Sequence, residues 1–405
     1  MPEQRFEIDG QPDFELGTER TRKVTILAEL PESEKADGLV FLIPGMGGDK
    51  DADYSTMLRR YISARYNMVV ISVDGHCNTC RPMRSKEFGD VGVDIDSSSV
   101  IAALGQFVAN GNRVDCPLNS HNDVLALLRS DLKHTYRLRA TLTPPDGQYQ
   151  NFGVLAALDH IAALHHLIDE GIAFDTGNIV CLGSSHGGYI AHMMHKFAPN
   201  TFNGVIDASA YSETVTKFLD GQWGELDLQD GNLAYACSTV QRWQFRRPGE
   251  PTFFGPDRSL IRDTGYREHM MHVAEQGGRR CQFRMLHSRN DFVSAPALKA
   301  RQADLLSSLG FDVTFDLIGE EDVDGKFIKS ADHGMGVALN LLFDRYYPTL
   351  ARRGGKIDRE LGTVLCFEGP KMTYTLGYKS GSIHPTARCD DRYPPSEAHR
   401  LRVAG

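Results

Sequence analysis

The order of apolar and polar positions along the chain predicts a mostly parallel β-sheet with helices between its strands. Continuous apolar runs closed by glycine, proline or small polar residues predict strands buried on both faces, at residues 38–45, 68–75, 178–183, 202–209, 281–288 and 311–319. Apolar residues at helical spacing predict helices over residues 53–66, 152–172, 187–198, 295–310 and 334–353. Strands that alternate with helices are typical of an open α/β fold with right-handed crossovers and helices on both faces.

Two stretches interrupt this alternation and predict insertions. Residues 76–150 and 211–278 are polar and irregular, and each lies between strands of the same predicted sheet. We therefore expect one α/β domain over residues 1–350, whose insertions form a cap, with two or three helices in the first. Residues 351–405 form a C-terminal extension, for which the apolar runs predict a β-hairpin packed on the core.

Composition and charge exclude several classes of protein. The 405 residues are 41% hydrophobic and carry a formal net charge of −9, which argues against nucleic acid as the main partner. No apolar run reaches the roughly 18–20 residues that span a bilayer, and the first residues lack the apolar stretch of a secretory signal. Eight scattered cysteines favour a reduced, cytoplasmic protein.

Two groups of residues carry side chains that can bind a metal. Cys77 and Cys80 form a C-x-x-C motif, but no second pair follows at the spacing of a zinc site. His192 and His195 lie three residues apart on a predicted helix, with no third ligand in view. We therefore expect no metal or redox role for the two cysteines. We expect His192 and His195 to be core histidines and not metal ligands.

Two further motifs imitate ligand sites. The acidic segment Glu320–Gly325 resembles the start of a calcium-binding loop, but the twelfth position is Ala331, where such a loop needs a bidentate glutamate. The glycines before Lys50 do not have the spacing of a phosphate-binding loop. The sequence therefore predicts neither a metal nor a cofactor.

The segment "NIVCLGSSHGGYIAHMM" predicts a nucleophile. Ser185 lies between Gly183 and Gly187 in the pattern G-x-S-x-G, after a predicted strand and before a predicted helix. A serine in such a turn is presented above the carboxyl edge of the sheet, and the glycines avoid a clash between neighbouring elements. Ser184 stands one residue too early for this role.

A base and an orienting acid follow at the ends of later strands. Asp291 comes directly after one predicted strand, and His333 lies in the loop after the next. Both positions are at the carboxyl edge, where catalytic groups gather in α/β sheets. Asp207 is the rival acid, because it ends an earlier strand; the context "HSRND" favours Asp291. Asp332 is expected to be solvated or to cap the loop.

An oxyanion hole needs two backbone donors near the nucleophile. The N–H of His186 directly follows it, and the segment "PGMGGDKD" supplies the N–H of Met46. Gly45, Gly47 and Gly48 allow the backbone of that segment to come close.

These motifs together resemble the α/β-hydrolase superfamily over residues 36–350. "LIPGMGG", "HSRNDFVS" and "DHGMG" are similar to the oxyanion, acid and histidine segments of its members, although Pro44 stands where many carry histidine. The segments "QYQNFGVLAALD" and "EEDVDGKFIKSADHGMG" resemble an uncharacterised bacterial branch. The resemblance implies an α/β-hydrolase fold and a triad of Ser185, Asp291 and His333.

The sequence therefore predicts a serine hydrolase that cleaves an ester, thioester or amide of a small-molecule acyl substrate. The second insertion contains Trp223, Trp243, Arg246 and Arg247, and together with the acidic first insertion they predict a pocket for a polar substrate. Gly45 and Gly47 are further candidates for substrate binding. A carboxylesterase or deacylase is preferred. A peptidase or amidase and a catalytically inactive binding protein are the alternatives. The natural substrate and assembly into a homo-oligomer stay open.

Overall fold

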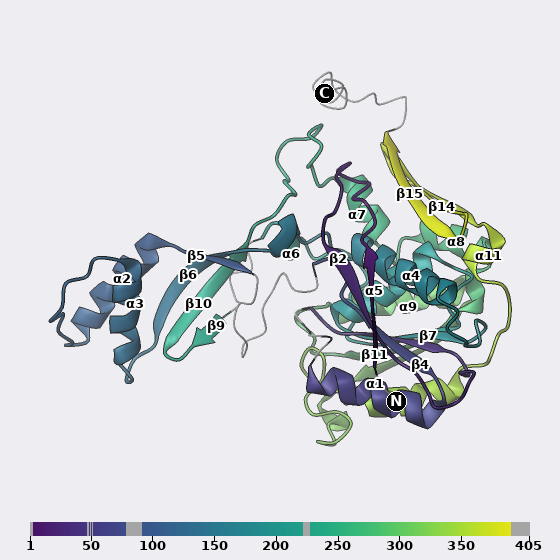
Figure 1. Cartoon of the computed structure of the whole chain (residues 1–405), viewed down its shortest axis with the longest axis horizontal. Helices are drawn as coiled ribbons and strands as arrows, with labels where there is room; N and C mark the ends of the chain where they lie inside the picture. Colours follow the sequence, from purple (N-terminus) through teal and green to yellow (C-terminus); the bar gives the residue numbers. More distant parts are fainter. Residues whose placement is uncertain are drawn as a thin grey trace. The chain divides into compact units, whose positions relative to one another are not determined.

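The computed structural model describes residues 3–46, 48, 50, 52–77, 91–221 and 227–389 (Figure 1). The chain divides into two units, and each is described by itself. The first unit consists of Met1–Asn78, Asn151–Thr214 and Phe245–Gly405, and the second of Thr79–Gln150 and Val215–Gln244. No helix of the described residues is long and apolar enough to cross a membrane.

An eight-stranded sheet forms the centre of the first unit, in the order β1-β2-β4-β3-β7-β8-β11-β12. Its strands are β1 (Gln4–Asp9), β2 (Lys23–Glu29), β3 (Leu39–Ile43), β4 (Val69–Val73), β7 (Ile179–Ser184), β8 (Gly204–Ala208), β11 (Gln282–Ser288) and β12 (Asp312–Ile318). β1 pairs with β2, and β2 with β4, in antiparallel fashion. All other neighbours are parallel. The carboxyl ends of β3, β7, β8 and β11 therefore meet at one edge.

Alternate residues of the buried strands point to opposite sides of the sheet, and both sets are largely apolar. Helices therefore cover both faces of this sheet. The helices of the first unit are α1 (Asp53–Tyr66), α4 (Val154–Asp169), α5 (His186–Phe197), α7 (Pro256–Arg262), α8 (Arg267–Glu275), α9 (Pro296–Ser308), α10 (Leu339–Tyr346) and α11 (Asp358–Leu361). Val40 and Val180 pack with Leu58 of α1 and Leu342 of α10 on one face. Phe41 turns the other way and meets the ring of His160 on α4. Thus α1 and α10 cover one face and α4 the other.

Several histidines on α4 and α5 are buried as neutral rings, which makes stability depend on pH. Burial lowers the pKa of His165, His186 and His195 from 6.5 to about 4 in each case. Between these values the unfolded chain binds a proton that the folded chain does not. The free energy of unfolding is therefore expected to fall as the pH drops from about 6.5 toward 4, by up to about 3 kcal/mol per histidine.

Urea unfolding at a series of pH values measures this effect. His195→Gln removes one titrating ring whose Nε2 lies 3.1 Å from the carbonyl oxygen of Gly278. That variant is expected to start from a lower stability at pH 7.5 but to lose less of it on acidification. An unchanged slope in His195→Gln, or wild-type stability that rises toward pH 4, contradicts the prediction.

The C-terminal part of the first unit is a three-stranded antiparallel sheet. Its strands are β13 (Val364–Glu368), β14 (Met372–Lys379) and β15 (Ser382–Cys389). Tyr378 donates its hydroxyl to the carbonyl oxygen of Phe197 on α5 at 3.1 Å, and Phe367 packs against His269 of α8. The extension therefore packs on the core, with one strand more than the predicted hairpin.

The second unit has its own sheet, in the order β5-β6-β10-β9. The strands are β5 (Gly92–Ile95), β6 (Tyr136–Thr143), β9 (Asp227–Asp230) and β10 (Leu233–Thr239), accompanied by α2 (Ser97–Ala109), α3 (His121–Ser130) and α6 (Thr216–Leu219). Leu138 and Tyr235 of the sheet share a core with Val100 of α2 and Leu128 of α3. The first predicted insertion thus contributes two strands besides its helices. From the second predicted insertion, α7 and α8 belong to the first unit.

The last predicted helix was wrong in its bounds. Residues 334–353 were expected to be helical, but α10 covers only Leu339–Tyr346 and a 3₁₀ turn follows at Tyr347–Thr349. Gly334, Met335 and Gly336 have φ values of 76°, 52° and 52°, so this segment turns in the left-handed region and cannot be helical. Pro348 lacks the N–H that a continuing helix would need.

Candidate active site

Ser185 occupies a strained turn between β7 and α5. Its backbone has φ 53° and ψ −121°, a conformation that side-chain-bearing residues rarely adopt. The N–H of Ser185 donates to the carbonyl oxygen of Ala208 at the end of β8, at 2.7 Å. Strain of this kind persists only where the surroundings hold it in place. The turn therefore fixes the Ser185 side chain at the carboxyl edge of the sheet.

The glycines around Ser185 are required by close backbone contacts. A Cβ on Gly183 would lie 2.5 Å from the backbone nitrogen of Gly188. A Cβ on Gly187 would lie 2.1 Å from the carbonyl oxygen of Ile43. Real Cβ atoms do not approach backbone atoms so closely, so neither position accepts a larger residue. The same contacts bring the end of β3 against the turn.

His333 lies beside Ser185 in the loop between β12 and α10. Its Nε2 is 2.7 Å from the Oγ of Ser185, so the hydroxyl can donate its proton to the ring. The N–H of Gly334 donates to the Oγ of Ser209 at 2.9 Å, which ties the loop to the end of β8. The ring of Tyr211 faces the imidazole with centroids 6.1 Å apart and an interplanar angle of 26°. These contacts hold the imidazole toward Ser185.

Asp291 accepts a hydrogen bond from the other nitrogen of this ring. The Nδ1 of His333 lies 2.9 and 2.8 Å from the two carboxylate oxygens of Asp291. The backbone N–H groups of Val293 and Ser294 donate to Oδ1 at 2.9 and 2.8 Å. Burial alone would raise the pKa of Asp291, but the hydrogen bonds from His333 and Ser294 outweigh it and hold the pKa below its usual value. The carboxylate therefore stays charged opposite the imidazole.

Asp207, the rival acid, belongs to a different buried cluster. Its Oδ2 lies 2.8 Å from the Nε2 of His192 on α5 and 3.1 Å from the Nζ of Lys299 on α9. Burial raises its pKa, but Lys299 and His192 outweigh that effect and lower the pKa to about 2. Among the described contacts, Asp291 is the carboxylate that meets His333, and Asp207 is not.

The two predicted oxyanion donors lie on segments that meet at Ser185. His186 is the first residue of α5, and Ser185 is its N-terminal cap residue. On the other segment, a Cβ on Gly45 would lie 3.5 Å from the Cβ of Ser185, so the chain before Met46 runs against the turn. That the N–H groups of Met46 and His186 hold an oxyanion stays a prediction.

The remaining residues predicted to bind substrate have different outcomes. Gly47 and Trp223 lie outside the described residues. Trp243 belongs to the second unit, where it is 5% exposed and packs edge-on against Tyr149 with ring centroids 5.4 Å apart. Its role in binding substrate stays a prediction.

The acidic segment Glu320–Gly325, which resembles the start of a calcium-binding loop, uses two of its carboxylates to accept backbone hydrogen bonds. Asp324 Oδ1 accepts from the N–H groups of Lys326, Phe327 and Ile328, and Asp322 accepts from Gly319, so both carboxylates close turns. No cluster of metal-ligand side chains is found in the part of the chain that the structure describes.

The cysteines differ in part from the expectation. Cys77 is disulfide-bonded, so the expectation of reduced cysteines is wrong there. Its C-x-x-C companion, Cys80, lies outside the described residues. Cys116, Cys181, Cys237, Cys281, Cys366 and Cys389 are free thiols.

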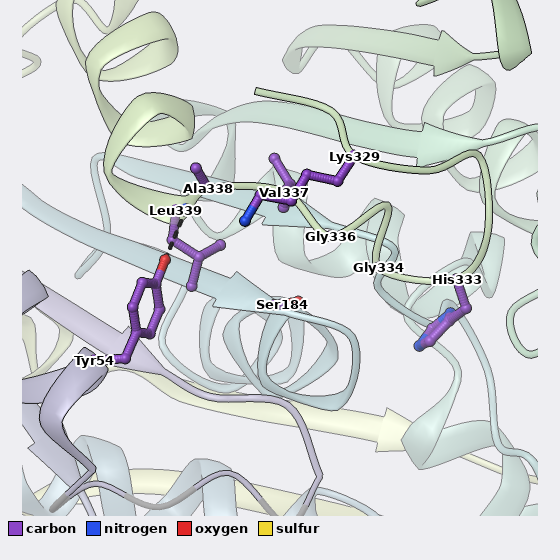
Figure 2. A pocket seen from close by; sticks show the side chains of 9 residues that line it. All are labelled: Tyr54, Ser184, Lys329, His333, Gly334, Gly336, Val337, Ala338 and Leu339. Carbon is purple, nitrogen blue, oxygen red and sulfur yellow. Dashed lines mark hydrogen bonds between the residues drawn. The ribbon is translucent and has the colours of Figure 1, made fainter. Parts of the chain in front are cut away.

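A pocket lies beside His333 that the sequence did not predict. It has a volume of about 420 Å³ and is lined by Tyr54, Ser184, Lys329, His333, Gly334, Gly336, Val337, Ala338 and Leu339. Figure 2 shows Ser184 between Tyr54 and His333, which lie at opposite ends. The usable signals were the position of Tyr54 shortly after the predicted oxyanion segment and that of Lys329 four residues before His333.

The strand order, the strained turn at Ser185 and the hydrogen-bonded Ser185, His333 and Asp291 define an α/β-hydrolase fold. Residues 4–361 match the family described as "Protein of unknown function (DUF2920)", and the chain belongs to that family.

Solved structures with the same fold class share little sequence with this chain. A puromycin-hydrolyzing peptidase of Mycobacterium tuberculosis is 17% identical over 87% of this chain and 40% of its own length, with a TM-score of 0.44. An S-formylglutathione hydrolase of Agrobacterium tumefaciens is 12% identical over 87% of this chain and 95% of its own, with a TM-score of 0.44. A carboxylesterase of Lactobacillus plantarum is 8% identical over 79% of this chain and 83% of its own length, with a TM-score of 0.40. The chain thus spans less than half of the peptidase. A comparison with curated proteins found no match.

Proposed function

We propose that this protein is a serine hydrolase that cleaves a carboxylic ester through an acyl-enzyme, acting as a carboxylesterase or deacylase on a polar substrate. The observation that supports the proposal is the chain of hydrogen bonds from Ser185 through His333 to Asp291 at the carboxyl edge of the sheet. A hydroxyl is a weak nucleophile by itself, and this arrangement supplies both a base and an orienting acid.

In the proposed mechanism His333 takes the proton from the Ser185 hydroxyl as the oxygen attacks the substrate carbonyl carbon. Asp291 holds the ring in the tautomer with a proton on Nδ1 and stabilises the imidazolium that forms. The N–H groups of Met46 and His186 would stabilise the oxyanion, at about 3–4 kcal/mol for one such donor. His333 then protonates the leaving group, and water hydrolyses the acyl-enzyme by the reverse sequence of proton transfers.

A panel of p-nitrophenyl acyl esters, acyl-CoA thioesters and peptide amides tests this proposal. The expected result is faster turnover of an oxygen ester than of a thioester or an amide, with a burst of acyl-enzyme formation. Faster cleavage of peptide amides would make the protein a peptidase or amidase. Absence of turnover, together with absence of labelling by a fluorophosphonate, would instead favour a binding protein on the same fold.

Asp291→Asn is expected to lower kcat by about 10⁴-fold with little change in stability, because the amide favours the wrong tautomer of His333. The same change at the rival acid provides the matched control. The Nζ of the buried Lys299 lies 3.1 Å from the carboxylate of Asp207, and Asp207→Asn leaves this ammonium without a charged partner. The variant is therefore expected to lose about 3 kcal/mol of stability or more. Below its lowered melting temperature it is expected to keep its turnover. Loss of turnover in folded Asp207→Asn, with turnover kept in Asp291→Asn, would reverse the assignment.

A further inference from the structure

The pocket beside His333 contains no carboxylate among its nine lining residues. Lys329 supplies the ammonium group among these nine residues. Figure 2 shows the Lys329 side chain extending along the pocket toward the end where Tyr54 and Leu339 lie. Within the described residues the Nζ of Lys329 forms neither an ion pair nor a hydrogen bond, and its cationic group is available to a ligand.

A second donor lies at the same end. The hydroxyl of Tyr54 accepts a hydrogen bond from the N–H of Leu339 at 3.0 Å, as the dashed line in Figure 2 marks. Because its oxygen already accepts at this place, the hydroxyl proton is free to be directed to an acceptor in the pocket. An ammonium and a hydroxyl donor in one pocket suit an anionic group better than a neutral or cationic one.

The position of this pocket links it to the reacting bond. Ser184, directly before the nucleophile, and His333, which contacts the nucleophile, both line it. A group seated here would therefore belong to the same substrate molecule whose carbonyl lies at Ser185.

We propose that the pocket lined by Tyr54, Lys329 and His333 binds an anionic group of the substrate, so that the enzyme prefers esters carrying a carboxylate. The inference rests on the proposed serine hydrolase function and names its substrate class. The carboxylate can belong to the acyl chain or to the leaving group, and both place the same chemistry beside Lys329.

Two pairs of esters that differ only in charge test the proposal. For the acyl side, the mono-p-nitrophenyl ester of glutaric acid is compared with p-nitrophenyl valerate. For the leaving group, 4-acetoxybenzoate is compared with its methyl ester. The wild type is expected to prefer the anionic member of at least one pair about tenfold in kcat/KM, chiefly through KM. The pair that shows the preference identifies which side of the bond carries the anion.

Lys329→Met is expected to reduce that preference about tenfold, and Lys329→Glu to invert it. The matched control is Lys326→Met, because Lys326 lies on the same loop, is exposed and does not line the pocket. That variant is expected to keep the wild-type preference. Equal preference in wild type and Lys329→Met, or the same loss in Lys326→Met, would overturn the anion site while leaving the hydrolase proposal intact.

Binding of glutarate gives a readout that does not depend on turnover. Glutarate is expected to raise the melting temperature of the wild type and of Lys326→Met, and to raise that of Lys329→Met much less. If glutarate stabilises wild type and Lys329→Met equally, or stabilises neither, the anion site is wrong. Failure of every ester to turn over, with selective binding of glutarate, would contradict the hydrolase proposal and support the site.

Discussion

Replacing Ser185 by alanine is expected to lower kcat for the best ester by about 10⁶-fold and to abolish labelling by a fluorophosphonate probe. The change removes the oxygen that would carry the acyl group and that lies 2.7 Å from the Nε2 of His333. The strained backbone, with φ 53°, is held by the neighbouring strands and accepts alanine as it accepts serine, so the melting temperature should change little. Turnover by absorbance and labelling by in-gel fluorescence measure the two effects.

The neighbouring serine provides the control for this experiment. Ser184 ends β7 one residue before the turn and was the alternative nucleophile. Ser184→Ala is expected to label like the wild type. If Ser185→Ala labels as strongly as the wild type, or if labelling disappears in Ser184→Ala alone, the nucleophile has been assigned to the wrong residue.

His333→Ala is expected to lower kcat by a similar factor, about 10⁶-fold, since the base and the nucleophile act as one unit. The fold should remain intact, because the side chain of His333 is 19% exposed and Asp291 keeps the N–H groups of Val293 and Ser294 as hydrogen-bond donors. Circular dichroism and the melting temperature check the fold, and kcat checks the chemistry.

Added imidazole separates a catalytic role of His333 from a structural one. The alanine leaves space beside Ser185, and free imidazole in that space can accept the proton. A rate that rises with the imidazole concentration in His333→Ala, but not in Ser185→Ala, is the expected result. A rate for His333→Ala within about tenfold of the wild type would rule out His333 as the base.

The contacts among Ser185, His333 and Asp291 could be predicted because the sheet places strand ends together. A serine after β7, an aspartate after β11 and a histidine after β12 are far apart in sequence, but parallel strands bring their carboxyl ends to one edge. Buried strands read as unbroken apolar runs, so their ends can be located in the sequence. The choice between Asp291 and Asp207 was harder, since both end buried strands, and the buried Lys299 that pairs with Asp207 lies on a distant helix.

The second unit was less predictable because polar or small residues interrupt the apolar positions of its strands. In β6, "YRLRATLT" alternates between buried and exposed positions, a pattern of period two that indicates a strand. This strand lies within a polar stretch, so the sequence predicts an irregular insertion over residues 76–150 instead. The strand β10, "LAYACST", has small residues at its less buried positions, so its hydrophobicity differs little between buried and less buried positions. The alternation within these strands was a weaker signal than the continuous apolar runs of the central sheet.

The pocket with Lys329 was hard to predict, because its lining comes from several parts of the chain. Tyr54 begins α1, Ser184 ends β7, and Lys329 and Leu339 flank the loop that carries His333. The left-handed conformations at Gly334, Met335 and Gly336 set the course of that loop, and a helical pattern in "GMGVALNLL" hides them. Pockets of this kind depend on loop geometry more than on the order of elements.

The pairing of β6 with β10 has a consequence for the order in which the chain can fold. These strands pair in parallel, with Tyr136 opposite Leu233, although all of α4, β7, α5 and β8 is synthesised between them. The sheet of the second unit can close only after the ribosome has released β10, when β1, β2, β3, β4, β7 and β8 are already available to pair. We therefore expect six of the eight strands of the central sheet to assemble first during synthesis. Until β10 emerges, β6 stays unpaired on its β10 side and is exposed to chaperones and proteases.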